Sequence, residues 1–217
     1  MSSEREAFEA LVAGDAVRLR ALLEGNPALA AARAPDGVSL LLRAQYSMND
    51  DLVAAVLAAE PEMGAHEAAA VGDADLLRHL VDGQPELVRA FASDGFAPLH
   101  LAAFFRRPHA VRLLLERGAD PNAPAVNDTM VAPLHSAAAS GDRESVRLLL
   151  AAGADPNARQ RGGFAPLHAA AAAGDRELVE MMLDNHADRA VETDDGRTPA
   201  VLARERGHGA LAELLAG

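Results

Sequence analysis

Apolar residues recur along the chain at spacings of three and four, which place them on one face of an α-helix. Three such stripes are Val111, Leu114 and Leu115; Val146, Leu149 and Leu150; and Val179, Met182 and Leu183. Alanine-rich stretches, such as 134–139 and 167–173, precede the second and third stripes at a short distance. The pattern predicts pairs of short helices, with an alanine-rich first helix and a leucine-rich second helix.

Glycine and aspartate mark the boundary between the two predicted helices of a pair. Gly141 and Gly174 provide the positive φ angle that ends a first helix. Asp142 and Asp175 follow directly and cap the second helix by accepting hydrogen bonds from its free N–H groups. Each predicted pair is therefore a helix, a tight turn and a second helix.

The helix pairs belong to an internal repeat. The string Ala-Pro-Leu-His ends at His100, His135 and His168, and Gly-Ala-Asp-Pro-Asn-Ala occurs at 118–123 and 153–158. Extending the register to both ends gives seven units, centred on Phe8, Leu42, His66, His100, His135, His168 and Val201. A period of about 34 residues is typical of a solenoid, in which each unit buries its apolar face only by stacking on its neighbours.

These motifs resemble the ankyrin-repeat family, whose unit carries a Thr-Pro-Leu-His-x-Ala-Ala box, a Val-x-x-Leu-Leu second helix and a Gly-Ala-Asp-x-Asn-Ala turn. The similarity is clear over 94–217 and weaker over 1–93. The resemblance implies an all-α repeat solenoid, an ankyrin stack of about seven helix pairs. It also implies β-hairpin fingers in the C-terminal half, which line a concave face together with the first helices.

The chain departs from the family pattern in two ways. Alanine replaces the box threonine at Ala97, Ala132 and Ala165, so that only Thr198 remains. The first three units have a proline-containing extension where the finger is expected, and the step from Leu42 to His66 is about ten residues short. We expect a single ankyrin-repeat domain over 1–217, with a seam near 58–65 where two helix pairs meet without a finger.

Charge and composition narrow the classes of partner. The net charge is −12, all the basic residues are arginines, and no basic stripe that could bind phosphates is visible. The sequence has no apolar segment long enough to span a bilayer, no secretory signal pattern and no cysteine. We therefore expect a cytoplasmic monomer that binds neither nucleic acid nor membrane, and whose partner is neutral or basic.

Histidines and carboxylates are the candidates for chemistry. His66, His100, His135 and His168 lie in register, but stacked helices are about 8–10 Å apart, too far for ligands of one zinc ion. We interpret them as structural residues that bond backbone between units. The carboxylate pairs at 50–51 and 194–195 are interpreted as caps, turns or solvated groups. The sequence thus predicts no catalytic residue, no metal ligand, no cofactor and no enzyme.

One cluster stands out as a candidate binding surface. Phe104, Phe105, Arg106 and Arg107 occupy positions that are small residues, glycine and aspartate in the next two units. The residue two before the box proline is also apolar in three successive units, at Phe96, Val131 and Phe164. The family pattern places both sets on the concave groove, with Arg197 as a further polar anchor. Exposed aromatic residues beside arginine are typical of binding hot spots.

The groove leaves several interpretations open. One or two of the phenylalanines could instead pack into the next unit as core, and Phe104 is the one that we expect to point outward. Our main prediction is a non-enzymatic module that binds a partner protein through the concave groove. A small-molecule binder or enzyme using the same groove, and a self-associating scaffold, are the alternatives.

Overall fold

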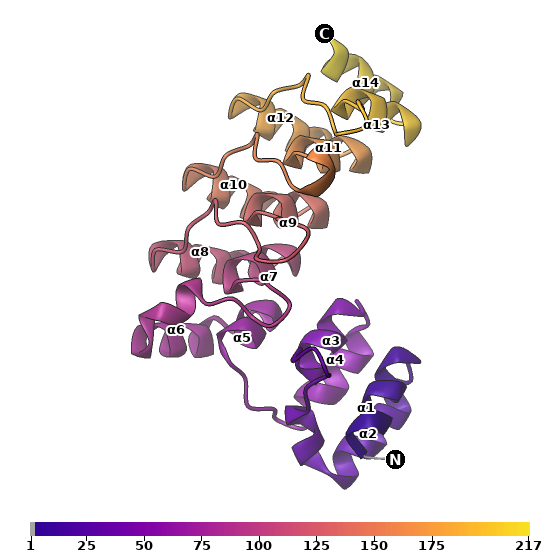
Figure 1. Ribbon diagram of the computed structural model, residues 1–217, viewed down its shortest axis with the longest axis vertical. Helices are drawn as coiled ribbons and strands as arrows, with labels where there is room; N and C mark the ends of the chain where they lie inside the picture. Colours follow the sequence, from indigo (N-terminus) through magenta and orange to yellow (C-terminus); the bar gives the residue numbers. More distant parts are fainter. Residues whose placement is uncertain (1–2) are drawn as a thin grey trace.

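The computed structural model describes residues 3–217, and within that range the chain folds into fourteen short α-helices. They are α1 Ser3–Val12, α2 Ala16–Gly25, α3 Leu40–Tyr46, α4 Asp50–Leu57, α5 Ala65–Val71, α6 Ala74–Gly83, α7 Pro98–Phe104, α8 Pro108–Glu116, α9 Pro133–Ser140, α10 Arg143–Ala151, α11 Pro166–Ala173, α12 Arg176–Asp184, α13 Pro199–Glu205 and α14 Gly209–Ala216. Three 3₁₀ turns, η1 Pro27–Ala31, η2 Pro85–Arg89 and η3 Arg161–Gly163, lie in the connections. Successive helices pair; the pairs of α5–α14 stack one above another, and those of α1–α4 are set to one side at the lower end (Figure 1), which confirms an all-helical ankyrin-type stack.

The helix boundaries follow the predicted turn chemistry. Gly141 and Gly174 end α9 and α11 with φ angles of 72° each. The side chain of Asp142 then accepts a hydrogen bond from Ser145 N (3.3 Å), and Asp175 caps α12 in the same way. These local signals fix where each helix begins and ends.

The predicted β-hairpin fingers are not strands. Residues 3–217 contain a single isolated β-bridge, between Arg33 and Ser39, and no strand. The loop tips close instead with two short-range backbone bonds, for example from Gln160 N to Phe164 O (2.9 Å) and from Gly163 N to Gln160 O (3.0 Å).

The core is divided along the chain. One cluster of buried apolar residues lies in α1–α4 and a larger one runs through α5–α14. Alanines such as Ala102, Ala137 and Ala170 are fully buried in the larger cluster, where small side chains allow close helix approach. Between these clusters lies a third, smaller one, which we call the bridging cluster; its buried members are Val38, Leu42, Ala70, Leu101 and Phe105.

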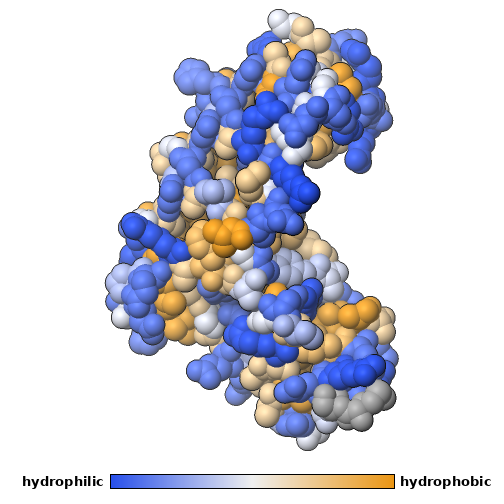
Figure 2. Space-filling view, in the orientation of Figure 1, coloured by the Kyte–Doolittle hydropathy of each residue, from blue (hydrophilic) through white to orange (hydrophobic). Residues whose placement is uncertain are grey.

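The connection between α4 and α5, residues 58–64, is non-helical and carries no loop tip of the kind found at other junctions. In Figure 1 this connection links the N-terminal helices α1–α4 to the rest of the stack. That the chain is one domain with its weakest interface here remains a prediction, and residues 1–2 of that domain lie outside the described residues. In the same view the space-filling surface is hollowed on one side, between the two ends of the stack (Figure 2).

Candidate functional site

The box histidines connect neighbouring units through both ring nitrogens. Ala132 N–H donates to His135 Nδ1 (3.3 Å), while His135 Nε2 lies 3.1 Å from Phe164 O of the following unit. Because Nδ1 accepts, the proton of the neutral ring is on Nε2, and that N–H donates to the carbonyl. His100 and His168 make the same two bonds. The predicted structural role of these histidines is confirmed.

Burial keeps these rings neutral. It lowers the pKa of His100 to about 4 and lowers the pKa values of His135 and His168 as well, although hydrogen bonds to backbone carbonyls oppose the shift. No group of three or more His, Asp or Glu side chains that could hold a metal ion occurs within residues 3–217. The ladder is therefore an uncharged connector between units.

In the third unit two residues divide the role of the box histidine. Gly64 N–H donates to Glu67 Oε2 (3.2 Å), the bond that Nδ1 accepts in the later units. His66 Nε2 lies 3.0 Å from Ala90 O, the bond to the next unit. Helix α5 begins one residue later than the register based on His66 implies, so that Glu67 takes the third helical position that the box histidine has in the later units.

The two adjacent phenylalanines behave differently. Phe104 is 36% exposed, whereas Phe105 is 6% exposed and belongs to the bridging cluster. The ring of Phe105 lies 5.5 Å from Tyr46 and 5.1 Å from Phe104. The expectation that Phe104 points outward is confirmed. Phe105, a predicted partner-binding residue, is instead core, because the bridging cluster and the Tyr46 ring of α3 pack against it.

Phe104 lines an apolar cavity of about 280 Å³, which we call the groove cavity. Its apolar lining is Tyr46, Phe96, Leu101, Phe104, Val131 and Ala139. Polar side chains of Thr129, Ser136 and Gln160 and the rings of two box histidines complete it. The structure thus brings together three of the predicted residues, Phe96, Phe104 and Val131, in one concave site.

Tyr46 is the lining residue that sequence reasoning missed. Its hydroxyl donates to Asp94 Oδ2 (2.7 Å), and burial, with that carboxylate, raises the pKa of Tyr46. A signal was present, since Tyr46 follows Leu42 by four residues just as Phe104 follows His100. The repeat register therefore placed both rings at the same position of the first helices of the second and fourth units.

Phe164 and Arg197 line a second hollow farther along the same face, of about 360 Å³, which shares His135, Ala139 and Gln160 with the groove cavity. The guanidinium carbon of Arg197 lies 5.9 Å from the centre of the Phe164 ring. Arg197 Nε is 2.9 Å from Asp195 Oδ2 as an ion pair without hydrogen-bond alignment. The predicted residues thus form two adjoining hollows.

The neighbouring arginines also differ. Arg106 is exposed, with a φ of 58°, and its side chain has no hydrogen-bond or ion-pair partner in the described part of the chain. Arg107 Nε donates to Ala70 O (3.0 Å), and a Cβ on Gly72 would lie 2.7 Å from Arg107 Cδ. Arg107, predicted as a polar anchor for the partner, is therefore a contact between units.

Comparison with known proteins places the chain in a family. The model for ankyrin repeats in three copies matches residues 28–125, 65–160 and 134–217. The neurogenic locus notch homolog protein 4 of Homo sapiens is 38% identical over 92 residues, which cover 42% of this chain but only 4% of that protein. Within residues 3–217 no helix has the length and apolar character needed to cross a bilayer. Because the family model spans nearly all of the chain, the chain belongs to the ankyrin-repeat family.

Proposed function

We propose that this chain binds a partner protein by receiving an apolar side chain of the partner in the groove cavity. Ankyrin repeats are generally protein–protein interaction modules and are typically non-enzymatic. The observation that carries the proposal is the apolar lining of Tyr46, Phe96, Leu101, Phe104 and Val131 in a concave site. Apolar anchors in such pockets supply most of the binding energy of many interfaces.

The size of the groove cavity favours a side chain over a free ligand. At about 280 Å³ it falls just below the roughly 300–1,000 Å³ of small-molecule pockets. Phe164 and Arg197 in the adjoining hollow extend the contact along the face, and Arg106 lies beside Phe104 at the other end. These features support an extended interface centred on one buried anchor.

The net charge of −12 favours a neutral or basic partner. We expect the chain to act as a cytoplasmic monomer. A mass from light scattering tests the competing self-association, because a scaffold that used the same face would be dimeric or larger.

The experiment compares single phenylalanine variants in affinity capture from the native host. We expect Phe104→Ala to weaken capture by about thirtyfold, the effect of about 2 kcal/mol at a hot spot, and to shift the melting temperature little. Phe91→Ala is the matched control, because Phe91 is 40% exposed and lies outside both hollows. Equal capture by the two variants would contradict the proposal.

Phe105→Ala separates folding from binding. Because Phe105 is buried, its truncation should cost about 3–5 kcal/mol of stability, whereas Phe104→Ala should cost about 0.5 kcal/mol or less. Urea denaturation of both variants measures this difference. A large loss of stability for Phe104→Ala would place that ring in the core and remove the basis of the proposed anchor.

A further inference from the structure

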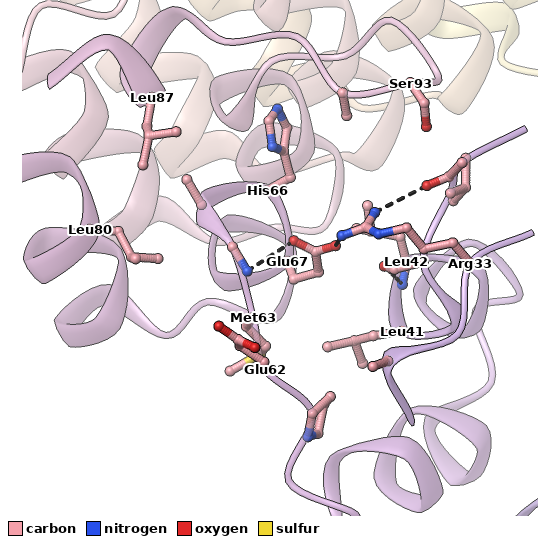
Figure 3. A pocket seen from close by; sticks show the side chains of 18 of the residues that line it. Arg33, Leu41, Leu42, Glu62, Met63, His66, Glu67, Leu80, Leu87 and Ser93 are labelled. Carbon is pink, nitrogen blue, oxygen red and sulfur yellow. Dashed lines mark hydrogen bonds and ion pairs between the residues drawn. The ribbon is translucent and has the colours of Figure 1, made fainter. Parts of the chain in front are cut away.

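A further cavity, of about 600 Å³, lies between α3 and α5, beside the connection 58–64 and away from the two hollows of the groove (Figure 3). We call it the seam cavity. Its walls come from the loop before α3, from the connection 61–64, from α5 and α6, and from the loop before α7. It shares no lining residue with either hollow of the groove, so it is a separate site.

The seam cavity exists because a loop is missing. At three later junctions the loop tip of one unit donates a backbone hydrogen bond to the tip before it: Val126 N to Gly95 O, Arg161 N to Thr129 O and Asp194 N to Gly162 O, each 2.9 Å. The short connection 58–64 supplies no such tip between the loops that precede α3 and α7. The two loops meet each other instead, and a Cβ on Gly37 would lie 2.9 Å from Ser93 Cβ.

The backbone groups at this junction lack the hydrogen bond between loop tips that the later junctions have. Gly37 has the same position in its loop as Gly95 has in the loop before α7, but Gly37 O accepts from Arg33 Nη1 of its own loop (3.0 Å). Ser93 N–H, whose counterpart Val126 N–H bonds the preceding tip, has no acceptor within residues 3–217. The loops that precede α3 and α7 thus meet at the edge of the junction, and the seam cavity lies beside their contact.

A buried carboxylate faces this space. Glu67 is 5% exposed; its Oε2 accepts from Gly64 N–H (3.2 Å), and its Oε1 lies 3.6 Å from Arg33 Nη2. Charge-assisted bonds between nitrogen and carboxylate oxygen are normally about 2.7–2.9 Å, and a carboxylate has about four acceptor positions. The Arg33 side chain is 60% exposed and held by Gly37 O, so it compensates the buried charge only at a distance.

Apolar side chains form the wall beside the carboxylate. In Figure 3 Glu67 lies near the middle of the view, with Leu42 on one side, Leu80 and Leu87 on the other, and Met63 below. Met63, Leu80 and Leu87 are only half-buried, so apolar surface is available next to the negative charge. Glu62 adds a second carboxylate at the rim. The cavity therefore offers an anionic group and an aliphatic wall.

We propose that the seam cavity binds a small organic cation with an aliphatic body. A guanidinium or ammonium head pairs with Glu67, and the body lies against Met63, Leu80 and Leu87. A cavity of about 600 Å³ is within the range of small-molecule sites. This site goes beyond the proposed protein-binding groove and does not depend on it.

The test uses hexylguanidinium as the probe and isothermal titration calorimetry of the full chain. We expect saturable binding at one site and none of comparable strength for 1-hexanol, which lacks the charge. Glu67→Gln keeps an acceptor for Gly64 N–H but removes the charge, and should weaken binding by at least about tenfold. Glu144→Gln, which removes an exposed carboxylate far from the cavity, is the charge-matched control and should bind as the wild type does.

A second variant tests the role of the Glu67 charge without changing Glu67 itself, in case Glu67→Gln fails to fold. Arg33→Gln removes the cation that competes for Glu67, and because this side chain is largely exposed the fold should be retained. Binding of hexylguanidinium to Arg33→Gln should tighten several-fold. No saturable binding to the wild type, or equal affinities for wild type, Glu67→Gln and Arg33→Gln, would overturn the proposal.

The same cationic chemistry is also carried by the side chain of arginine in a peptide. A blocked Leu-Arg-Leu tripeptide, titrated in parallel, distinguishes the two sources. Weaker binding than hexylguanidinium assigns the seam cavity to a free cation, and tighter binding with the same dependence on Glu67 assigns it to a peptide side chain.

Discussion

His135 shows how single residues hold this stack together. One ring accepts a hydrogen bond within its own unit and donates one to the next, so the helix start and the junction depend on the same side chain. Glu67 and His66 show that the two tasks are separable when the local chain is shortened. The ring is needed for its two nitrogen atoms at fixed positions, and its titration plays no part in this role.

At the residue scale, His135→Ala should lower the free energy of unfolding by about 1–3 kcal/mol, because Ala132 N–H and Phe164 O lose their partner in a buried site. Urea denaturation measures the loss. His109→Ala, on the exposed surface of α8, is the control and should change little. Stoichiometric zinc should not raise the melting temperature, and a zinc-dependent increase that His135→Ala abolishes would contradict the structural role.

A pH dependence follows from the same rings. The pKa of His100 is lowered to about 4 in the folded state, while the unfolded value is about 6.5. The unfolded chain therefore binds more protons than the folded chain between these pH values. The contribution of His100 to the free energy of unfolding is intact above about pH 6.5, and up to about 3 kcal/mol of it is lost as the pH falls towards 4. Urea denaturation across this interval should show a shallower slope for His100→Gln. Parallel slopes for the two proteins would contradict the burial of a neutral ring.

At the scale of the element, the first helices begin in two ways. Ser39 and Thr198 cap α3 and α13 with a hydroxyl that accepts from Leu42 N (3.2 Å) and Val201 N (3.3 Å). The helices α7, α9 and α11 begin at an alanine that has no such group, and the box histidine holds the N-cap amide instead. The histidine bond thus maintains the helix start where the hydroxyl of the family box is absent.

Restoring the hydroxyl should stabilise such a helix. Ala132→Thr places an acceptor near His135 N–H and should raise the free energy of unfolding by about 0.5–1 kcal/mol, a typical value for an N-cap. Ala132→Val has a similar shape without the hydroxyl, and it measures the cost of adding volume at a buried position. Thermal unfolding of both variants gives the comparison, and a threonine variant no more stable than the valine variant would show that the cap does not form.

At the scale of the whole molecule, the bridging cluster joins the N-terminal helices α1–α4 to the rest of the stack. Leu42 and Tyr46 of α3 lie in one cluster with Leu101 of α7 and with Phe105, the residue that follows α7, and the Tyr46–Asp94 hydrogen bond supports the same junction. The cluster is small compared with the cores on either side of it. Disruption at this point should separate the N-terminal helices from the stack before either core melts.

Fragments test this organisation. Residues 64–217 should fold alone, because each pair in a linear array needs only its neighbours. Residues 1–63 should not, since chains of fewer than about 70 residues rarely bury enough apolar surface without a further staple. Circular dichroism and urea denaturation of both fragments provide the measurement. An unfolded 64–217 fragment would mean that the domain organisation has been misread.

The sequence alone determined the helix pairs, their ends and the structural role of the histidines. These features depend on periodicity, capping residues and a repeated box, all of which act within a unit or between adjacent units. The placement of Phe96, Phe104 and Val131 on one face was predicted through the family resemblance, and the structure brings them together. The fingers were predicted as hairpins through the family resemblance, but in residues 3–217 the loop tips form hydrogen-bonded turns and no strand.

Only the tertiary structure decided what happens where the repeat is interrupted. Next to the short connection 58–64, α3 packs against α5, and its Tyr46 ring reaches both Phe105 in the bridging cluster and the groove cavity. The same connection leaves Glu67 beside an unfilled space. A local pattern specifies a regular junction because every unit meets an identical neighbour. The geometry of an irregular junction depends on side chains far apart in the chain, and it emerges only when the whole stack is assembled.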